Sequence, residues 1–303
     1  MITLENMVLP SPEQMDFIIQ GMRNPMNSWE KSDSRTCRQD GSFCMECEHK
    51  NGYCLGENDH SLMQSLSEAG TDHRKYMRMM AVYVRIKAPL YWWKEFDTYK
   101  VGTVANSCST MHKIQEKEFT TEDFSCEHLL NTSNNDAGDA FFLNDTSNIR
   151  VDGDDLLCLS IHVLNYYRER YLQTKDKRYW WQMIQLLPSS YNQTRNVMLN
   201  YEVLTNIYHS RKNHKLDEWR KFCGWIESLP YSELITGAIF NVGDKVKYVR
   251  KGSIYYGKEG YIVKVEPEKI ARVQIPIRLT SGDGFTTIPC SFDNLKPVEN
   301  KEK

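Results

Sequence analysis

The apolar pattern of this 303-residue chain changes character at residues 235–240. Before this point, long segments carry apolar residues at helical spacing, whereas residues 241–297 alternate apolar and polar side chains between turn glycines. A chain of this length typically forms about two domains. We therefore predict a larger domain over 1–236, containing both helices and strands, and a small β-barrel over 241–297.

Six segments of the first domain have the pattern of helices. Apolar residues recur every three or four positions in them, and Gly70 and Pro230 mark the ends of two. The stretch AVYVRI alternates and is rich in β-branched and aromatic residues, so we predict a strand that ends near Pro89. The predicted fold class is therefore α+β. The helices are expected at about 12–22, 58–70, 154–172, 178–187, 193–210 and 216–228.

Composition argues against several classes of protein. No apolar run approaches the ~20 residues that a membrane span requires. The first residues lack the basic start and apolar stretch of a secretory signal. We therefore expect a cytoplasmic protein without a membrane partner. The net charge of -2 gives no global indication of a nucleic-acid partner.

Two polar segments interrupt the first domain. Residues at about 31–57 are rich in Cys, Gly and charged residues, and residues at about 120–154 are rich in Asn, Asp, Ser and Thr. Long connections of this kind are either functional or disordered. We predict a Cys-rich insertion in the first and a long loop or flap in the second.

Four of the nine cysteines fall within 18 residues, with the spacing C-x6-C-x2-C-x6-C. Zinc prefers thiolate ligands, and a C-x2-C pair supplies two of them from one turn. The surrounding residues are too polar to build a core, so a bound metal would supply folding free energy. We predict a structural zinc site, with unligated or disulfide-forming cysteines and an iron–sulfur cluster as the alternatives. The ligands would be Cys37, Cys44, Cys47 and Cys54.

The predicted helix over 193–210 and the turn after it carry side chains suited to a small polar ligand. Asn200 and Asn206 are not quite two turns apart, so their amides face broadly the same side. Arg211 and His214 follow at the C-terminal end, where the helix dipole favours cations. An arginine fork suits a phosphate or a pyrimidine carbonyl. The alternative is that all four are surface residues of an amphipathic helix.

These residues lie in a segment that resembles the C-terminal half of flavin-dependent thymidylate synthases, the ThyX family: LLPSSYNQTRNVMLNYEVLTNIYHSRKNHKLDEWRKFCGWIESLPY. An earlier segment is similar to the helix, turn and strand of that family: DHSLMQSLSEAGTDHRKYMRMMAVYVRIKAPLYWWKEF. Together with what lies between them, the two segments span about 160 residues in the family's order. The residues that match family motifs are Gly70, Pro89, Leu90, Pro188, Asn200, Asn206, Arg211, His214 and Arg220.

The chain departs from the family at its signature motif. Thr98, Tyr99 and Lys100 stand where the family has Arg-His-Arg, while Asn106 and Ser109 fit the element that follows. Lys100 could neutralise a phosphate as a point charge, and Tyr99 could stack on a ring. The resemblance therefore identifies a divergent member that lacks the Arg-His-Arg signature.

The resemblance implies helices packed on a mixed or antiparallel sheet, and a homotetramer with its sites between subunits. It also implies methylation at C5 of a pyrimidine nucleotide such as dUMP. FAD would be the cofactor, with NADPH and methylenetetrahydrofolate as co-substrates. The implied roles are catalysis for Arg211, nucleotide binding for Asn206, His214, Ser109 and Lys100, and flavin binding for Asn200, Tyr99 and Asn106.

Two other functions fit the same residues. The chain could keep the fold and a nucleotide pocket without the chemistry, or it could be a nucleic-acid- or protein-binding adaptor of phage or mobile-element origin. Residues 241–297 resemble small Tudor/KOW-type (SH3-like) barrels, which often bind nucleic acid or protein. An accessory or oligomerisation role is the alternative for this segment.

Two runs of aromatic residues and one lone cysteine are further candidates for functional residues. The runs Tyr91-Trp92-Trp93 and Trp180-Trp181 could stack on a flavin or a base, or could anchor the core and a subunit interface. Cys108 would be a nucleophile if its pKa were lowered, and otherwise a buried structural thiol.

Overall fold

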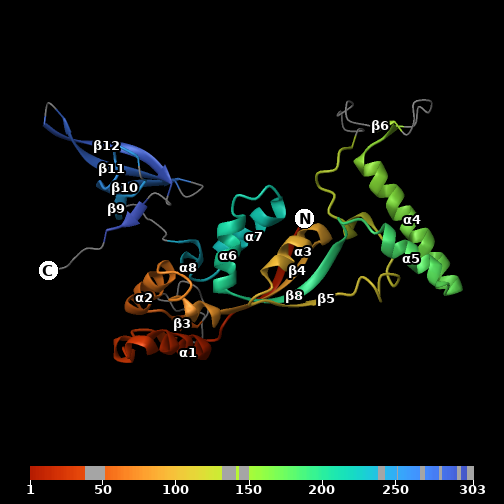
Figure 1. Cartoon of the computed structure of the whole chain (residues 1–303), viewed down its shortest axis with the longest axis horizontal. Helices are drawn as coiled ribbons and strands as arrows, with labels where there is room; N and C mark the ends of the chain where they lie inside the picture. The colour runs from red at the N-terminus through yellow and green to blue at the C-terminus, as the bar shows by residue number, and fades with distance from the viewer. Residues whose placement is uncertain are drawn as a thin grey trace.

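Two antiparallel sheets, one central and one near the C-terminus, form the framework of the fold (Figure 1). Helices lie before, between and after the strands of the central sheet. The prediction of helices combined with antiparallel sheet is therefore confirmed. The computed structural model describes residues 1–37, 52–131, 141–142, 150–237, 243–250, 252–266, 270–279, 282–291 and 295–298.

The central sheet has four antiparallel strands. They are β1 (Thr3–Val8), β4 (Ala81–Pro89), β5 (Val104–Ser107) and β8 (Asn192–Asn200), in the spatial order β1-β4-β8-β5. Val84 of β4 lies opposite Val197 of β8, and both are buried. Along β4, buried residues alternate with more exposed ones, as a strand with one face on the core requires. The strand predicted to end near Pro89 is confirmed.

Three helices pack above this sheet in the view of Figure 1. They are α3 (Leu90–Phe96), α6 (Tyr201–Arg211) and α7 (Asp217–Glu227). The ring centre of Trp92 lies 4.8 Å from that of Trp219 and 5.1 Å from that of Phe96, and all three side chains are buried. Packed aromatic rings bury large apolar areas, so these contacts fix α3 against α7. The helix predicted over 216–228 is confirmed.

The helix predicted over 193–210 is wrong in its first half. Residues Asn192–Asn200 form strand β8, and helix α6 begins only at Tyr201. Val197 and Leu199 are buried and alternate with more exposed neighbours, which is a period of two rather than 3.6. Pairing with β4 on one edge and β5 on the other holds this segment extended.

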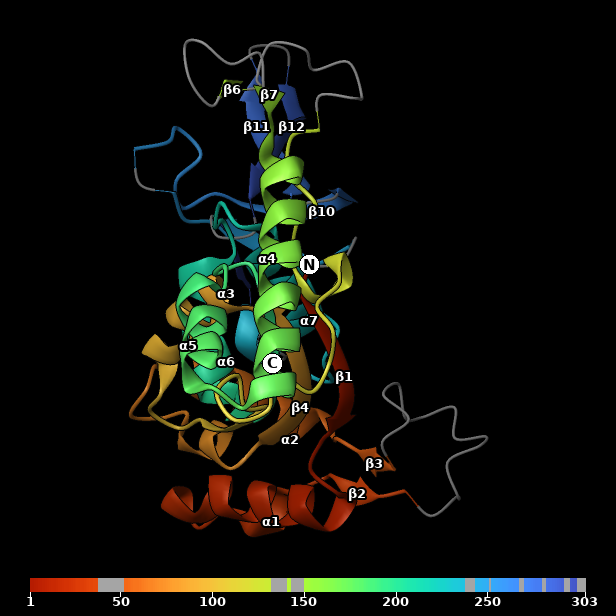
Figure 2. The same ribbon diagram turned by 90° about the vertical axis from the view of Figure 1, so that its right-hand side faces the viewer.

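A helical hairpin projects from one end of the sheet (Figures 1 and 2). Its helices α4 (Gly153–Thr174) and α5 (Lys177–Leu186) confirm the two helices predicted there. Leu164 of α4 and Met183 of α5 are fully buried in a core that also includes Phe119 and Phe124. The hairpin therefore has its own core, separate from the larger core between the central sheet and helices α3, α6 and α7.

The two polar segments predicted from composition are described only in part. Residues 38–51, 132–140 and 143–149 lie outside the described residues. What is described there forms short antiparallel ribbons and one 3₁₀ turn. These are β2 (Arg35–Thr36) paired with β3 (Tyr53–Cys54), β6 (Phe141–Phe142) paired with β7 (Arg150–Val151), and η5 (Thr121–Asp123).

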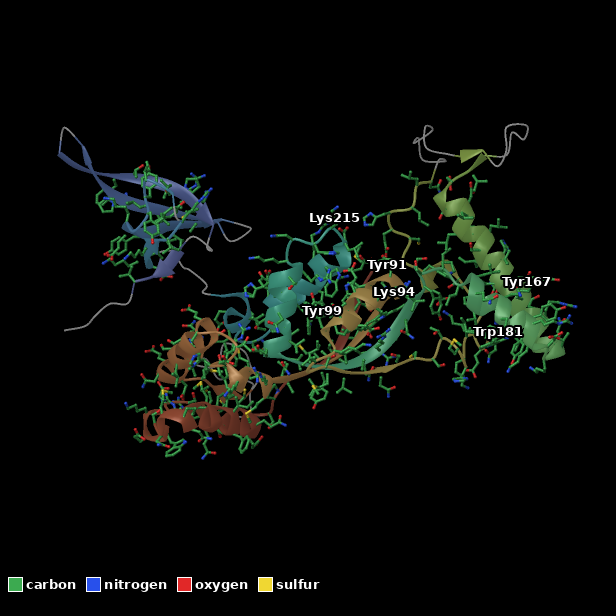
Figure 3. All side chains as sticks on the ribbon, viewed as in Figure 1. Tyr91, Lys94, Tyr99, Tyr167, Trp181 and Lys215 are labelled. Atoms are coloured by element: carbon green, nitrogen blue, oxygen red, sulfur yellow. The ribbon has the colours of Figure 1, made fainter. Side chains whose placement is uncertain are left out.

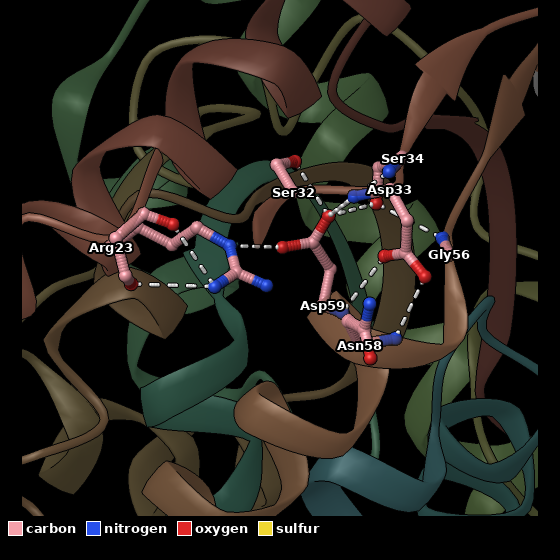
Figure 4. Close-up of polar contacts among 8 residues, drawn as sticks. Arg23, Ser32, Asp33, Ser34, Gly56, Asn58 and Asp59 are labelled. Carbon is pink, nitrogen blue, oxygen red and sulfur yellow. Dashed lines mark hydrogen bonds and ion pairs between the residues drawn. The ribbon is translucent and has the colours of Figure 1, made fainter. Parts of the chain in front are cut away.

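A buried ion pair joins the N-terminal helices α1 (Pro12–Arg23) and α2 (Glu57–Glu68) (Figure 4). Arg23 Nε lies 2.6 Å from Asp59 Oδ1, and the two side chains are 4% and 0% exposed. Asp59 Oδ2 accepts further hydrogen bonds from the segment 32–34. A buried charge is tolerated only when it is paired and hydrogen-bonded, so this network fixes the base of the Cys-rich insertion to both helices. Both helices were predicted from the sequence.

The remaining elements are short. No helix in the described ranges is both long and apolar enough to cross a membrane. The short helices are η1 (Asn24–Met26), η2 (Trp29–Lys31), η3 (Lys75–Arg78), η4 (Asp97–Tyr99) and α8 (Glu233–Thr236).

The C-terminal sheet is open where a closed barrel was predicted. It contains β9 (Lys245–Tyr248), β10 (Glu259–Glu266), β11 (Ile270–Leu279), β12 (Gly282–Ser291) and β13 (Leu295–Pro297). Their order is β12-β11-β10-β9-β13, and within the described residues no pairing joins the outer strands β12 and β13. β13 is only three residues long and ends in a proline, which has no N–H to donate, so it offers little edge for closure. The apolar side chains of the C-terminal sheet still form a core of their own, centred on Val246, Ile262 and Val273.

Candidate functional site

Arg211, at the C-terminal end of α6, is the centre of a polar cluster. Its Nε donates to Tyr99 Oη at 2.9 Å, and its Nη1 donates to Glu95 Oε2 at 2.7 Å. Glu95 lies near the end of α3 and Tyr99 is the last residue of η4, four positions later, so both side chains reach the same side. The Arg211 side chain is only 19% exposed, so it lies against the protein rather than in open solvent.

Trp219 closes the cluster from α7. Its Nε1 donates to Glu95 Oε2 at 2.8 Å, and the guanidinium carbon of Arg211 lies 4.8 Å from its ring centre. The same carbon lies 5.7 Å from the ring centre of Tyr99. Contact with two aromatic rings and a charge-assisted hydrogen bond together restrict the orientation of the guanidinium group.

His214 lies at the edge of the cluster, in the turn between α6 and α7. Its Nδ1 accepts a hydrogen bond from the backbone N–H of Leu216 at 3.2 Å. In the neutral imidazole this leaves the proton on Nε2, which lies 3.5 Å from Glu95 Oε2. Glu95 is thus the common neighbour of Arg211, Trp219 and His214, and its carboxylate balances the charge of Arg211.

Asn200 lies at the opposite end of α6 and caps it. Its Oδ1 accepts a hydrogen bond from the Val203 N–H at 2.9 Å, and its Nδ2 lies 3.5 Å from the Gly102 carbonyl oxygen. The first N–H groups of a helix lack partners within the helix, and a side-chain oxygen at this position satisfies one of them. Asn200, which was assigned to flavin binding, is only 8% exposed, and both ends of its amide have hydrogen-bond partners within the chain.

Asn206 contacts Arg74 rather than Arg211. Its Oδ1 lies 3.4 Å from Arg74 Nη2, while Arg74 Nε donates to Glu202 Oε2 at 2.7 Å. The side chains of Arg74 and Glu202 are 14% and 9% exposed, so this is a largely buried ion pair. Arg74 also lines a cavity of about 230 Å³, whose other walls come from α2, α6 and the region of α8.

The candidate residues around β5 lie on the surface of the chain. Asn106 is exposed and pairs with Asn196 of β8. Ser109 accepts a hydrogen bond from the His112 N–H at 2.9 Å, which stabilises the turn after β5, and Lys100 is exposed. Among the described contacts, none joins Asn106, Ser109 or Lys100 to the Arg211 cluster.

The two described cysteines of the predicted metal site lie at the base of the insertion. Cys54 ends β3, and the Cys37 N–H donates to the Gly52 carbonyl oxygen at 2.8 Å, so the β2–β3 ribbon brings both ends of the cysteine loop together. Cys44 and Cys47 lie outside the described residues. Within the described ranges, no group of three or more His, Cys, Asp or Glu side chains is placed to hold a metal. The zinc site stays a prediction.

Most of the aromatic candidates are structural. Trp92 and Trp93 are fully buried, and Trp93 Nε1 donates to the Gln193 carbonyl oxygen at 3.0 Å. Trp181, on α5 of the helical hairpin, is 46% exposed (Figure 3). Cys108 is exposed, so the alternative that it is a buried structural thiol is wrong.

Two residues and one ion pair near the candidate site were not identified from the sequence. Glu95 stands four residues before Tyr99, and that spacing on a helix is the signal that indicates it. Trp219 fits the amphipathic pattern of the helix after His214, so the sequence predicts that it is a core residue. That pattern does not predict its hydrogen bond to Glu95. The pairing of Arg74 with Glu202 has no local signal, because the two residues are 128 positions apart.

Comparison with known proteins gives similarity at the level of structure only. No protein-family model matches the chain, and no curated protein matches its sequence. The chain is similar to thymidylate synthase X (ThyX) from Helicobacter pylori with FAD and dUMP, at a TM-score of 0.47 and 16% identity over 77% of this chain and 94% of that one. It is also similar to the UMP/dUMP methylase PolB from Streptomyces cacaoi bound with 5-Br UMP, at a TM-score of 0.46 and 13% identity over 78% and 94%.

Proposed function

We propose that this chain binds a pyrimidine nucleotide such as dUMP at the cluster around Arg211 and alkylates it at C5. The sequence resemblance to flavin-dependent thymidylate synthases assigns Tyr99, Arg211 and His214 to one site. The observation that carries the proposal is that all three converge on Glu95 or on one another, although Tyr99 and Arg211 are 112 residues apart. Independent surface residues of an amphipathic helix would have no reason to meet in this way.

Arg211 is the residue suited to hold the pyrimidine. A guanidinium has five N–H groups, and only the Nε and one Nη position are used by Tyr99 and Glu95. The others can donate to a uracil carbonyl or to a phosphate oxygen. Because Glu95 and two rings already fix the group, its donors would stabilise developing negative charge on the pyrimidine at little cost in reorganisation.

The remaining nucleotide contacts are proposed from the residues that the resemblance assigns to nucleotide binding. Lys100 directly follows Tyr99 and supplies an exposed positive charge for a phosphate. His214 Nε2 would donate to the base, and Ser109 would bind a phosphate oxygen from the turn after β5. Asn206 would contact the base only after exchanging its hydrogen bond with Arg74.

The side chains assigned to FAD do not fit that role as they stand in the chain. The Asn200 amide caps α6, and the Tyr99 ring already contacts Arg211 and Trp219, which leaves Asn106 as the exposed member of the three. Recruiting Asn200 would cost the helix its cap. FAD would supply the redox chemistry of a one-carbon transfer that uses methylenetetrahydrofolate and NADPH, and it would have to be held by other groups.

The same misfit favours a second function, which is nucleotide binding without turnover. A chain that keeps the Arg211 cluster but uses its flavin-side residues structurally retains recognition and loses redox chemistry. The C-terminal sheet and the turn before β10 expose three aromatic side chains, Tyr256, Tyr261 and Phe285, at 54%, 54% and 67%. Exposed aromatic side chains of this kind are suited to a nucleic-acid or protein partner, as an adaptor requires.

Calorimetric titration of the full chain with dUMP tests the site. We expect binding, and a loss of at least about 10-fold in affinity in Arg211→Ala, because a hydrogen bond to a charged group contributes roughly 1.5–3 kcal/mol. The matched control is Arg178→Ala, whose guanidinium is 84% exposed beside Asp176. Wild-type affinity in Arg211→Ala would reject the site.

Turnover is measured separately from binding. The visible spectrum after gel filtration shows whether a flavin is retained. Release of tritium from the C5 position of labelled dUMP, with FAD, NADPH and methylenetetrahydrofolate supplied, reports substitution at that carbon. Release supports the enzyme, binding without release supports the second function, and absence of binding contradicts both.

A further inference from the structure

Arg195 of β8 contacts the segment that follows α3, on the helix-covered face of the central sheet. It lies opposite Ile86 of β4, which is fully buried on that face, and its own side chain is 13% exposed. Its Nη1 donates to Asp97 Oδ1 at 2.8 Å, and its Nε donates to Gln193 Oε1 at 3.0 Å. One guanidinium group therefore holds two partners at once, which the planar fork of arginine allows.

Trp93 of α3 fixes the plane of that guanidinium. The guanidinium carbon of Arg195 lies 4.2 Å from the ring centre of Trp93. The ring itself is buried and held in place, because its Nε1 donates to the Gln193 carbonyl oxygen at 3.0 Å. A cation over the face of a tryptophan is attracted to the ring, and this contact together with two hydrogen bonds restricts Arg195 to one orientation.

Asp97 joins Arg195 to residues that are proposed to bind the nucleotide. Asp97 is the first residue of η4, and Tyr99 and Lys100 follow it within one turn. The turn is closed by Thr103, whose hydroxyl donates to the Tyr99 carbonyl oxygen at 3.0 Å and whose N–H donates to the Lys100 carbonyl oxygen at 3.2 Å. Because the segment 97–103 is compact, fixing Asp97 limits the positions that the Lys100 ammonium group can reach.

Gln193 joins Arg195 to the turn after β5. Its Nε2 donates to the Cys108 carbonyl oxygen at 2.9 Å, while its Oε1 accepts the hydrogen bond from Arg195. The Cys108 N–H also donates to the Thr194 carbonyl oxygen at 2.9 Å, so this turn has both a backbone and a side-chain contact with β8. Ser109 directly follows Cys108. A chain of three hydrogen bonds therefore runs from η4 to this turn.

We propose that Arg195 positions the phosphate-binding part of the nucleotide site, by holding the segments of Lys100 and Ser109 at a defined spacing. This role rests on the proposed function, which assigns both residues to the nucleotide phosphate. The contacts of the described residues join neither of them to Arg211, so their placement depends on what holds the segments that carry them. Donors that are fixed before binding lose less conformational entropy when the phosphate arrives.

Hydrogen exchange of the full chain, followed by mass spectrometry, tests the connection without a ligand. Arg195→Met removes the donors and keeps an apolar side chain, so we expect exchange to become several-fold faster in 97–103 and in 108–112. Exchange in the α4–α5 hairpin should stay as in the wild type. The matched control is Arg85→Met, which removes an exposed arginine that donates to Asn196 on the opposite face of the sheet. Unchanged exchange in both segments of Arg195→Met would overturn the proposal.

Two further variants separate the two connections. Asp97→Ala should speed exchange in 97–103 alone, because it removes the acceptor on that side. Gln193→Leu should speed exchange in 108–112 alone, and by less, because the backbone hydrogen bond to Thr194 remains. Faster exchange across the whole chain in these variants would indicate a general loss of stability and would contradict a positioning role.

The ratio of the affinities for dUMP and deoxyuridine isolates the contribution of the phosphate. Calorimetry should show this ratio reduced by at least about 5-fold in Arg195→Lys, because a lysine ammonium group cannot hold Asp97 and Gln193 together. Gln193→Leu should reduce the ratio as well. Neither substitution changes the net charge, so a general electrostatic effect is excluded. Wild-type ratios in both variants would overturn the proposal.

Two other outcomes have different meanings. A reduced ratio in Arg195→Lys beside a wild-type ratio in Gln193→Leu would show that Arg195 binds the phosphate itself, and would overturn the positioning role. A wild-type chain that binds neither dUMP nor deoxyuridine would reject the proposed nucleotide site and the phosphate role with it. Tight dUMP binding by the wild type with no change of ratio in either variant would reject the role of Arg195 alone.

Discussion

The hydroxyl of Tyr99 accepts a hydrogen bond from Arg211 Nε at 2.9 Å, which joins the end of α3 and η4 to the end of α6. Glu95, one turn earlier, binds the same guanidinium at 2.7 Å. Tyr99 stands where the resemblance places the histidine of the missing signature. The chain therefore has a polar side chain against Arg211 at this position.

The Glu95 carboxylate holds Arg211 but also neutralises it. Glu95→Gln keeps the shape and an acceptor for Trp219 while removing the negative charge. Because the side chain is 35% exposed, solvent screens the pair, and we expect the free energy of unfolding to fall by only about 0.5–1.5 kcal/mol. The affinity for dUMP should rise several-fold, since a carboxylate near the nucleotide phosphate is gone.

Calorimetry and urea unfolding measure these two effects. Glu116→Gln is the control, because Glu116 is 56% exposed and pairs only with a neighbouring lysine at the surface. Weaker dUMP binding in Glu95→Gln than in the wild type would contradict this prediction, and would show that the contribution of Glu95 to the position of Arg211 outweighs its repulsion of the nucleotide.

Asn200 is expected to act through helix α6. Asn200→Ala removes the oxygen that caps the helix and should lower the free energy of unfolding by about 1 kcal/mol. Asn200→Asp keeps an oxygen at the cap, where a negative charge is also favourable, and should retain most of the stability. Urea unfolding distinguishes the two variants. An equal loss of unfolding free energy in both variants would contradict the capping role. If Asn200→Asp were as stable as the wild type but no longer bound a flavin, Asn200 would be a cofactor-binding residue.

Local spacing was enough to predict part of the site. Arg211 and His214 are three residues apart at the end of a helix, and their placement follows from α6 alone. The position of Tyr99 beside them could not be derived from spacing, because it depends on the packing of α3 against α7 through Trp92 and Trp219. Long-range packing of this kind leaves no periodic signal in the sequence.

Two errors of the sequence analysis have the same physical origin. The segment 192–200 carries polar residues that suit a helix surface as well as a strand, and only pairing with β4 and β5 decides between them. Alternation over 241–297 predicted strands correctly but not their closure. Closure depends on whether β12 can reach β13, which is a property of strand length and not of pattern.

The Cys-rich insertion is expected to bind one zinc ion. Metal analysis of the purified chain should find about one equivalent, and Cys37→Ser should lower both the metal content and the melting temperature, because the metal would supply folding free energy there. Cys108→Ser is the control, since Cys108 is exposed and distant in sequence from the cluster. Metal-free wild-type protein that melts at the same temperature with and without chelator would exclude the site.

Acid should weaken the buried network around Asp59, which includes its ion pair with Arg23. Burial raises the pKa of this carboxyl, but hydrogen bonds from Ser34, Ser32 and Arg23 outweigh it and hold the pKa below its ordinary value of 3.8. A carboxyl whose pKa is lower in the folded chain stabilises it above the unfolded pKa, and this stability is lost as the pH falls through the folded pKa. Unfolding by urea from pH 7 down to about pH 3 should therefore show a decline that begins near pH 4.

Asp59→Asn identifies the group responsible for that decline. At pH 7 the variant leaves the Arg23 guanidinium, 4% exposed, without its counter-charge, so we expect a loss of about 3–5 kcal/mol. Below about pH 4 the carboxyl of the unfolded wild-type chain binds a proton, so the stability that the ionised Asp59 provides declines and the difference between the two proteins should narrow. Asp176→Asn, at an exposed pair with Arg178, should give a small difference that changes little with pH. A gap between wild type and Asp59→Asn that stays constant down to pH 3 would mean that a different carboxyl controls acid unfolding.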